Sequence, residues 1–315
     1  MRIAKNLQKA CLLAGPVLCA HTANAVEAPN CSGGMELRLS APQVAQGNLV
    51  LAQIRSKKAL REVTGKWIDR SVYFWEVKAN PASRARSTGP RVDRREALLG
   101  VDLEKPPGTY ELSVTATTED GITAECSAKL VVTSGKFATE KLTVEKQFVE
   151  PNEQQASRAV AEQKKLRELF DRVTLEKLWQ GPFGFPLNGA TKGTNFGKRR
   201  ILNGQPRSPH TGADFPALMG TPVHATQSGR VVLAEELYFS GNTVIVDHGL
   251  GVYSLYGHLS ATNVGVGDGV KAGTILGKVG ATGRVTGAHL HWGITVNKAR
   301  VNPARLVTLL QKATF

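Results

Sequence analysis

Residues 267–293 read GDGVKAGTILGKVGATGRVTGAHLHWG, and up to Gly287 a glycine recurs every two to four residues between short apolar pieces. Glycine adopts the positive φ angles of tight turns without steric cost, and short apolar pieces between turns are typical of strands. The stretch therefore predicts short strands joined by tight turns. No GxGxxG motif follows a strand–helix–strand pattern here, so nucleotide binding is not expected.

The same stretch ends in HLHWG, in which Leu290 separates His289 from His291. Side chains at positions i and i+2 of a strand point to the same face. The two histidines are therefore expected to project into one cleft, with Leu290 packed behind them. One of them can bind a metal ion while the other moves protons.

Two further motifs supply candidate ligands: HTGAD contains His210 and Asp214, and YGHL contains His258. A catalytic zinc ion usually has three protein ligands and one open position, and it accepts imidazole nitrogen and carboxylate oxygen. His210, Asp214 and one histidine of the HLH pair would complete such a set. Pro209 and Gly212 favour a loop running into a strand, rather than a helix, for HTGAD.

The last third of the chain offers few alternatives to this set. Its other acidic residues after Gln180 are Glu235, Glu236, Asp247 and Asp268. The remaining histidines of the chain are His21, His224 and His248, and the last two are expected to be structural or solvated. Because the chain has no HExxH glutamate, a histidine is the group left with a pKa near neutrality for general base catalysis.

Taken in order, these motifs resemble those of the M23 family of zinc peptidases, the lysostaphin and LytM type, over about residues 183–304. The supporting strings are HTGADF (210–215), GTPV (220–223), SGRV (228–231), GNTVIVDHG (241–249), YGHL (256–259), the glycine-rich stretch 267–293 and VNP (301–303). The resemblance implies that Zn²⁺ is the cofactor and that a β-sheet peptidase domain carries it.

Carried over by position, the resemblance makes His210, Asp214 and His291 the zinc ligands. His258 and His289 become the catalytic pair, and the division of roles between them stays open. Some members of the family have a tyrosine shortly before the first zinc histidine that helps to hold the oxyanion, but residues 201–209, ILNGQPRSP, contain none. That role would pass to an arginine, to a backbone amide or to no group.

The function expected from the resemblance is zinc-dependent hydrolysis of peptide cross-links in peptidoglycan, with its peptide stems as the partner. The competing hypothesis is a non-catalytic binding or activator module that regulates another cell-wall hydrolase. Degenerate members of the family lose metal ligands, and none is missing here. The segment Glu235–Gly241 is expected to form an open loop that borders the substrate groove.

The start of the chain predicts export. Basic Arg2, Lys5 and Lys9 precede the apolar run 10–20, and Ala23-Asn24-Ala25 is a small-residue cleavage site, so residues 1–25 are interpreted as a signal peptide. The run of 11 residues is shorter than the roughly 20 that a membrane span needs. A lipoprotein is the alternative, although Leu18 before Cys19 is not the small residue expected there. The protein is therefore expected to be periplasmic or extracellular, without a transmembrane segment in the mature chain.

The rest of the chain predicts a mainly β protein. Residues 26–135 alternate apolar and polar positions between turns and are interpreted as an immunoglobulin-like antiparallel β-sandwich, with Cys31 and Cys126 expected to form a disulfide. Residues 136–180 form a linker with an amphipathic helix that is expected to pack on one of the domains or to occlude the site. Residues 181–315 form the peptidase domain with an antiparallel sheet.

The charge is concentrated in the last domain. The formal net charge is +14, and residues 181–315 carry 13 Lys and Arg against 5 Asp and Glu, whereas residues 26–180 carry 24 against 21. Such a positive surplus attracts polyanions. Nucleic acid is not expected because the chain has no nucleic-acid-binding motif, and the anionic cell wall is the favoured target.

Overall fold

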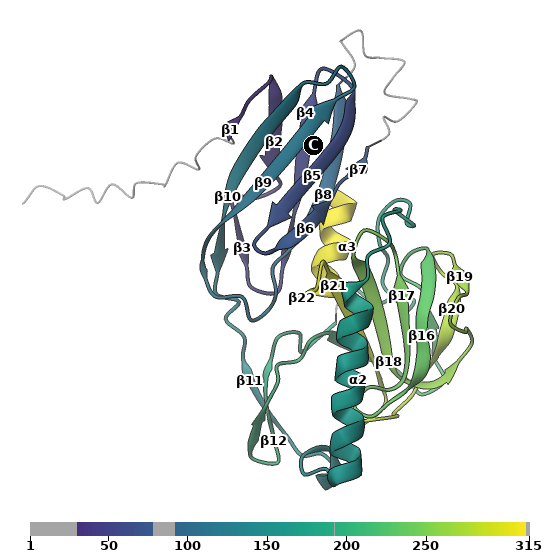
Figure 1. Cartoon of the computed structure of the whole chain (residues 1–315). Coiled ribbons are helices and arrows are strands. Elements are labelled where there is room, and N and C mark those ends of the chain that lie inside the picture. The colour runs from purple at the N-terminus through teal and green to yellow at the C-terminus, as the bar shows by residue number, and fades with distance from the viewer. Residues whose placement is uncertain (1–29, 78–91, 192, 313–315) are drawn as a thin grey trace, which may run out of the picture.

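The computed structural model describes residues 30–77, 92–191 and 193–312, and strands dominate them (Figure 1). The prediction of a mainly β fold is confirmed. The predicted signal peptide, residues 1–25, lies outside the described residues. Within the described parts of the chain, no helix combines the length and the apolar character that crossing a membrane requires.

Two sheets in the N-terminal part pack around one apolar core. The first has the order β1-β10-β9-β5-β6, with β3 parallel to β10, and the second has the order β2-β4-β8-β7. Their strands are β1 Asn30–Cys31, β2 Met35–Leu39, β3 Gln43–Ala45, β4 Leu49–Ser56, β5 Leu60–Trp67, β6 Arg70–Tyr73, β7 Trp75–Glu76, β8 Asp93–Gly100, β9 Gly108–Thr118 and β10 Thr123–Thr133. In β9 every second residue from Leu112 is buried, which is the alternation that the sequence predicts for a strand with one face on the core.

The expected disulfide is confirmed. Cys31 and Cys126 are bonded, and they lie directly opposite each other in the pairing of β1 with β10. The bond links strands that are 95 residues apart in the chain. A crosslink across so long a loop restricts the unfolded chain and so favours the folded state.

Strand β4 joins the two halves of the molecule. Its sequence LVLAQIRS is buried at seven of eight positions, because both of its faces are covered. Val50, Ala52 and Ile54 belong to the N-terminal core, whereas Leu49 and Leu51 belong to the core of the C-terminal sheet. The N-terminal sheets are therefore fixed to the C-terminal part by shared apolar packing.

The C-terminal sheet is antiparallel, with the order β14-β21-β18-β17-β16-β19. β20 pairs with β18 and with β15, and β22 pairs with β21. The strands are β14 Ala213–Pro216, β15 Pro222–His224, β16 Gly229–Leu237, β17 Gly241–Asp247, β18 Val252–Thr262, β19 Gly269–Val270, β20 Ile275–Val279, β21 His289–Val296 and β22 Ala299–Val301. The helix α3, Pro303–Lys312, follows β22 and lies between the two halves in Figure 1.

The linker contributes one strand to a small sheet and also contains a short 3₁₀ helix and a long helix. Parallel pairing joins β11 (Thr139–Leu142) to β12 (Arg199–Leu202), which pairs with β13 (Gln205–Arg207). The 3₁₀ helix η1, Lys146–Phe148, lies between β11 and the helix α2, Glu153–Asp171. Asn152 and Gln155 form a capping box at the start of α2.

The apolar side of α2 packs on the C-terminal sheet. Leu166, Leu169 and Phe170 contact a core cluster that contains Leu233 and Tyr253. The expectation that Glu235–Gly241 is an open loop is wrong for its first part, because Glu235–Leu237 belong to β16. There Glu235 accepts from Lys165 of α2 at 2.6 Å, so this end of β16 supports the helix.

The glycines of the 267–287 stretch serve two purposes. Gly267, Gly273 and Gly283 have positive φ angles, as turns require. Gly277 and Gly280 do not, and strand crowding explains them instead: a Cβ atom on Gly280 would lie 2.3 Å from the backbone nitrogen of Ser260. The prediction of positive φ is thus right for Gly267, Gly273 and Gly283 and wrong for these two positions in or beside β20. It is also wrong for Gly269 and Gly287, where a Cβ atom would meet nothing within 4 Å.

His248 is a core histidine whose ring is fully enclosed. Its Nδ1 donates to the carbonyl oxygen of Ser228 at 2.7 Å, and its Nε2 lies 2.7 Å from the hydroxyl oxygen of Ser254. Burial lowers the pKa of His248 to about 4. The ring is therefore neutral in the folded protein at neutral pH.

This burial makes stability depend on pH. Between pH of about 6.5, the pKa of an unfolded histidine, and pH 4, the unfolded chain binds a proton that folded His248 does not, so stability falls as the pH drops. We expect His248→Gln to be less stable than the wild type at neutral pH but to lose about 2 kcal/mol less between pH 6.5 and 4.5. Urea unfolding at both pH values measures this, and equal losses in the two proteins would contradict it.

Candidate metal centre

Three of the candidate side chains converge at the pairing of β14 with β21. Asp214 on β14 lies directly opposite His291 on β21, and His210 comes from the loop that leads into β14. The Nε2 atom of His210 is 2.9 Å from Nδ1 of His291 and 3.0 Å from Oδ1 of Asp214, and the last two atoms are 3.1 Å apart. One ligand atom from each residue therefore lies at the corner of a small triangle that could hold a metal ion.

The donor chemistry fits a metal ion. Nδ1 of His210 lies 3.0 Å from the carbonyl oxygen of Asn195, which can only accept, so Nδ1 carries the hydrogen and Nε2 presents a lone pair. Burial lowers the pKa of His210 to about 4, which keeps the ring neutral as a ligand must be. Ligands about 2.0–2.2 Å from a tetrahedral zinc ion lie roughly 3.3 Å from one another, only slightly farther apart than these three atoms.

Gly212 of HTGAD allows the chain before β14 to lie close to the ring of His291. A Cβ atom on Gly212 would lie 2.7 Å from Nε2 of His291 and 2.6 Å from the carbonyl oxygen of Trp292. Backbone contact this close excludes every residue with a side chain. The expectation of a loop that runs into a strand agrees with the structure, since β14 begins at Ala213.

The other two histidines face the same place. In β21, His289 and His291 lie on one face while Leu290 is fully buried behind them, as the HLH pattern predicts. Nδ1 of His289 donates to the carbonyl oxygen of Gly287 at 2.8 Å, so its Nε2 is free. That Nε2 atom lies 3.7 Å from Oδ1 of Asp214.

His258 is held in an unusual backbone conformation. Its φ angle is +63°, it lies where β17 and β18 change register, and its backbone N–H donates to Ser240 at 2.7 Å. Nδ1 donates to the carbonyl oxygen of Thr282 at 2.8 Å, which leaves Nε2 free. Burial, and then the charges of His291 and His289, lower the pKa of His258 to about 3. A non-glycine residue keeps such a conformation only where its surroundings impose it.

All five predicted side chains therefore lie close together. The rings of His258 and His289 have centroids 4.8 Å apart, and those of His210 and His291 are also 4.8 Å apart. His248 and His224 lie outside this group. His248 lies in the core, and Nδ1 of His224 forms a hydrogen bond with the carbonyl oxygen of Gly273.

Beside these residues lies a cavity of about 250 Å³. Its lining includes Asp214, His258 and His289. The linker contributes Glu140, Leu142 and Val144 to the same lining. The linker strand β11, rather than the helix α2, thus borders the site.

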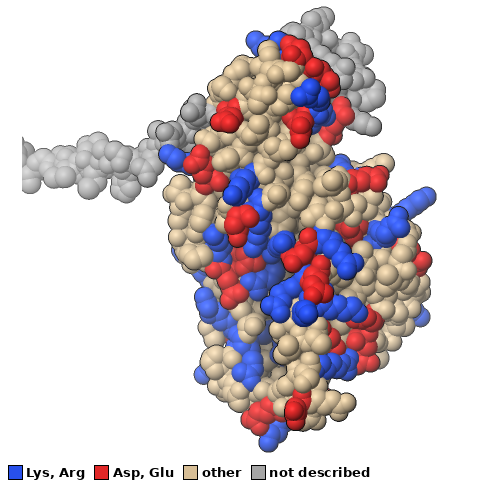
Figure 2. Space-filling view, in the orientation of Figure 1, with Lys and Arg blue, Asp and Glu red and all other residues tan. Residues whose placement is uncertain are grey.

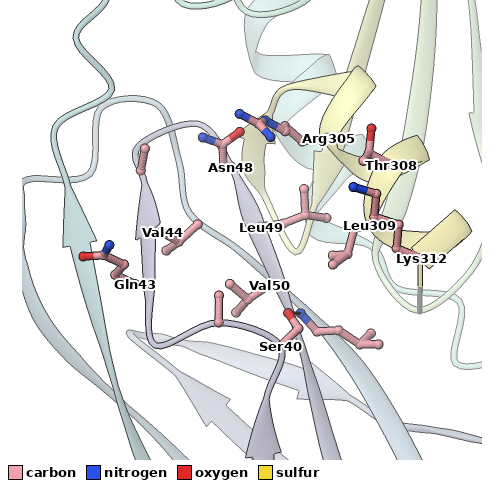
Figure 3. A pocket seen from close by; sticks show the side chains of 13 residues that line it. Ser40, Gln43, Val44, Asn48, Leu49, Val50, Arg305, Thr308, Leu309 and Lys312 are labelled. Atoms are coloured by element: carbon pink, nitrogen blue, oxygen red, sulfur yellow. Dashed lines mark hydrogen bonds between the residues drawn. The ribbon is translucent and has the colours of Figure 1, made fainter. Parts of the chain in front are cut away.

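A larger cavity, of about 600 Å³, lies between β4 and α3 (Figure 3). Its lining includes Ser40, Asn48, Leu309 and Lys312, and the described residues around it contribute neither a histidine nor a carboxylate. The described residues that line it therefore lack the imidazole, thiolate and carboxylate ligands of a zinc site. Size alone therefore does not identify the site.

Sequence reasoning missed two arginines in the smaller cavity, Arg200 and Arg284. The Nη2 atom of Arg200 lies 3.6 Å from Oδ2 of Asp214. Arg284 could have been noticed, because it is the only charged residue between Lys278 and His289 in the motif stretch. No sequence pattern marks Arg200, because only the tertiary structure brings β12 to the smaller cavity.

Positive and negative side chains alternate over the face of the molecule seen in Figure 2, where Lys and Arg gather over the linker and the adjoining sheet with Asp and Glu between them. The positive surplus of the C-terminal part does not form one unbroken patch on this face. This face therefore offers no single basic surface, and the positive surplus contributes to the overall field of the molecule.

Together, the fold and the site define a β-sheet domain with a His–Asp–His group that could hold a metal ion and two further histidines beside it. Residues 208–303 match the model of peptidase family M23, so the chain carries a domain of this family, whose members are zinc metallopeptidases. A crystal structure of a putative M23 peptidase from Pseudomonas aeruginosa is similar with a TM-score of 0.57 and 26% identity, covering 86% of this chain and 97% of that chain.

Two curated relatives agree with the family. The chain is 40% identical over 112 residues to the DD-carboxypeptidase/endopeptidase Mpg of Neisseria meningitidis, covering 34% of this chain and 26% of that protein. It is 32% identical over 180 residues to the peptidoglycan DD-endopeptidase ShyA of Vibrio cholerae, covering 57% of this chain and 37% of that protein. The match thus spans between a quarter and two fifths of the length of these relatives.

The close approach at Gly212 generates a prediction for metal binding. Gly212→Ala would push the ring of His291 away from its partners, so we expect zinc, used as the probe, to bind about tenfold or more weakly. Gly269→Ala is the matched control, because a Cβ atom there meets nothing within 4 Å. Competition with a chelating dye measures both affinities. Wild-type affinity in Gly212→Ala would show that the metal does not need His291 in this position.

Proposed function

We propose that this protein is a zinc metalloendopeptidase that hydrolyses peptide cross-links of peptidoglycan. The observation that carries the proposal is the convergence of His210, Asp214 and His291 with two more histidines at one cavity in an M23 domain. The relatives named for their action on peptidoglycan supply the substrate class. The proposed cross-link contains a D-amino acid rather than a glycine bridge.

In this proposal His210, Asp214 and His291 hold the zinc ion, which when bound would polarise the substrate carbonyl and lower the pKa of a water molecule. His258 and His289 move the protons. Carbonyl oxygens hold the Nδ1 hydrogens of both rings, so each presents the Nε2 lone pair. The pair can therefore orient and deprotonate the attacking water, stabilise the tetrahedral intermediate and return a proton to the leaving amine.

The proposed organisation has four parts: a signal peptide at residues 1–25, an immunoglobulin-like domain at 26–135, a linker at 136–180 and the peptidase domain at 181–315. The separate apolar core of the N-terminal sheets supports the second boundary. The disulfide supports export to the periplasm or the extracellular space, where such bonds persist.

A binding or activator module for another wall hydrolase is the competing function. Such a module does not need a metal centre with an adjacent pair of proton carriers. The complete set of five side chains at one cavity favours the enzyme.

Removing a proton carrier separates catalysis from metal binding. We expect His258→Asn to lower the rate of hydrolysis about 100-fold or more while one zinc ion per chain stays bound. Asparagine tolerates the left-handed φ angle at this position, so the backbone is preserved. His224→Asn is the control and keeps both activity and zinc. Loss of zinc from His258→Asn would instead make His258 a ligand.

Metal removal tests the function itself. The wild-type protein is expected to release peptides from purified sacculi, a chelator is expected to stop the release, and added zinc is expected to restore it. Mass spectrometry of the digested muropeptides identifies the bond that is cleaved. If zinc-loaded protein releases nothing from the sacculi, the enzyme proposal is wrong and the module is favoured.

A further inference from the structure

Arg200 and Arg284 share the cavity of the candidate metal centre and have no role in metal binding. Arg200 lies on β12, and Arg284 lies in the loop between β20 and β21. Both line the cavity together with Asp214, His258 and His289. The fold thus brings two guanidinium groups next to the proposed reaction centre.

Acidic groups pair with these arginines only in part: Nη2 of Arg200 lies 3.6 Å from Oδ2 of Asp214, which is the one ion pair that either guanidinium makes among the described residues. Among the described residues, no hydrogen-bond or ion-pair partner contacts the guanidinium of Arg284, which lies 4.5 Å from the ring of Phe239. The buried Nε atom of Arg200 has no hydrogen-bond partner. Of the two carboxylates that line the cavity, Glu140 accepts from Lys198 at 2.9 Å and Asp214 points its Oδ1 at the histidines.

The positive charges of Arg200 and Arg207 lie near Arg284. Burial, and then the nearby charges of Arg200 and Arg207, lower the pKa of Arg284 to about 10. The guanidinium of Arg207 donates hydrogen bonds to the carbonyl oxygens of Val149 and Pro206, so these donors are not available to a ligand in the cavity. An anion in the cavity would relieve the repulsion and satisfy the unpaired donors.

A carboxylate is the anion that fits. The planar fork of a guanidinium matches the two oxygens of a carboxylate, and the stacking of Arg284 on Phe239 holds the fork in place. In a cross-link made by a diamino dicarboxylic acid, the carbon that bears the released amine also carries a free carboxylate. A glycine bridge has no carboxylate at that position.

We propose that Arg200 and Arg284 form a carboxylate-binding subsite that holds the free carboxylate beside the scissile amide and so selects cross-links of a diamino dicarboxylic acid. The proposal rests on the proposed endopeptidase function and names its substrate class. In this proposal both arginines bind the substrate, whereas His210, Asp214 and His291 bind the metal ion.

The test uses two synthetic cross-linked peptides that differ in one group, a free carboxylate or the corresponding carboxamide beside the scissile amide. With zinc-loaded wild-type protein, we expect kcat/KM for the acid to exceed that for the amide about tenfold or more. In Arg284→Gln this ratio is expected to fall toward one, and in Arg284→Lys to an intermediate value, because the charge stays but the fork is lost. Arg230→Gln, an exposed arginine on β16, is the matched control and keeps the wild-type ratio.

The ratio is measured on one preparation, so a partly misfolded variant does not change it. A wild-type ratio near one overturns the subsite while cleavage itself upholds the endopeptidase. An unchanged ratio in Arg284→Gln with a lower rate on both peptides overturns it too, because the arginine would then stabilise the oxyanion or the fold. Cleavage of neither peptide by the wild type overturns the endopeptidase proposal and the subsite with it.

Discussion

The pairing of β14 with β21 is the constraint on which the site depends. It places Asp214 directly opposite His291, and the loop before β14 returns His210 to the same point. The only N–H of the neutral His210 ring is committed to the carbonyl oxygen of Asn195, so the Nε2 lone pair of His210 faces Nδ1 of His291 and Oδ1 of Asp214 across about 3 Å. Ligand atoms this close together could hold a shared cation. The main-chain hydrogen bonds between β14 and β21 thus fix the relative positions of Asp214 and His291.

The surroundings support this arrangement through rigid contacts. Gly212 lets the backbone of one strand lie against the ring of His291, and a change of register between β17 and β18 holds His258 in a left-handed conformation. Carbonyl acceptors fix the tautomers of three rings, those of His210, His258 and His289. Such preorganisation reduces the movement that catalysis needs. The shared packing of β4 with both cores fixes the N-terminal sheets beside this rigid domain.

The cavity combines residues whose positions in the chain are far apart. Asp214, His258 and His289 belong to the motifs HTGAD, YGHL and HLHWG, whereas Glu140 and Leu142 come from the linker and Arg200 from β12. Parallel pairing of β11 with β12 attaches the linker to the segment that leads into the metal centre. The linker therefore contributes to the shape and charge of the cavity, and the substrate must fit against residues outside the central sheet.

The sequence by itself determined the mainly β fold and identified the five candidate side chains that the structure brings together, because the spacing of HTGAD and HLH and the alternation of strands are local patterns. It also identified the two cysteines that form the disulfide. Only the tertiary structure decided that Arg200 and the linker border the cavity, that Glu235 supports α2, and that Gly277 and Gly280 serve close strand contact rather than turns. These features arise from contacts between segments distant in sequence, and the burial and charge that give each residue its role exist only when those segments pack together.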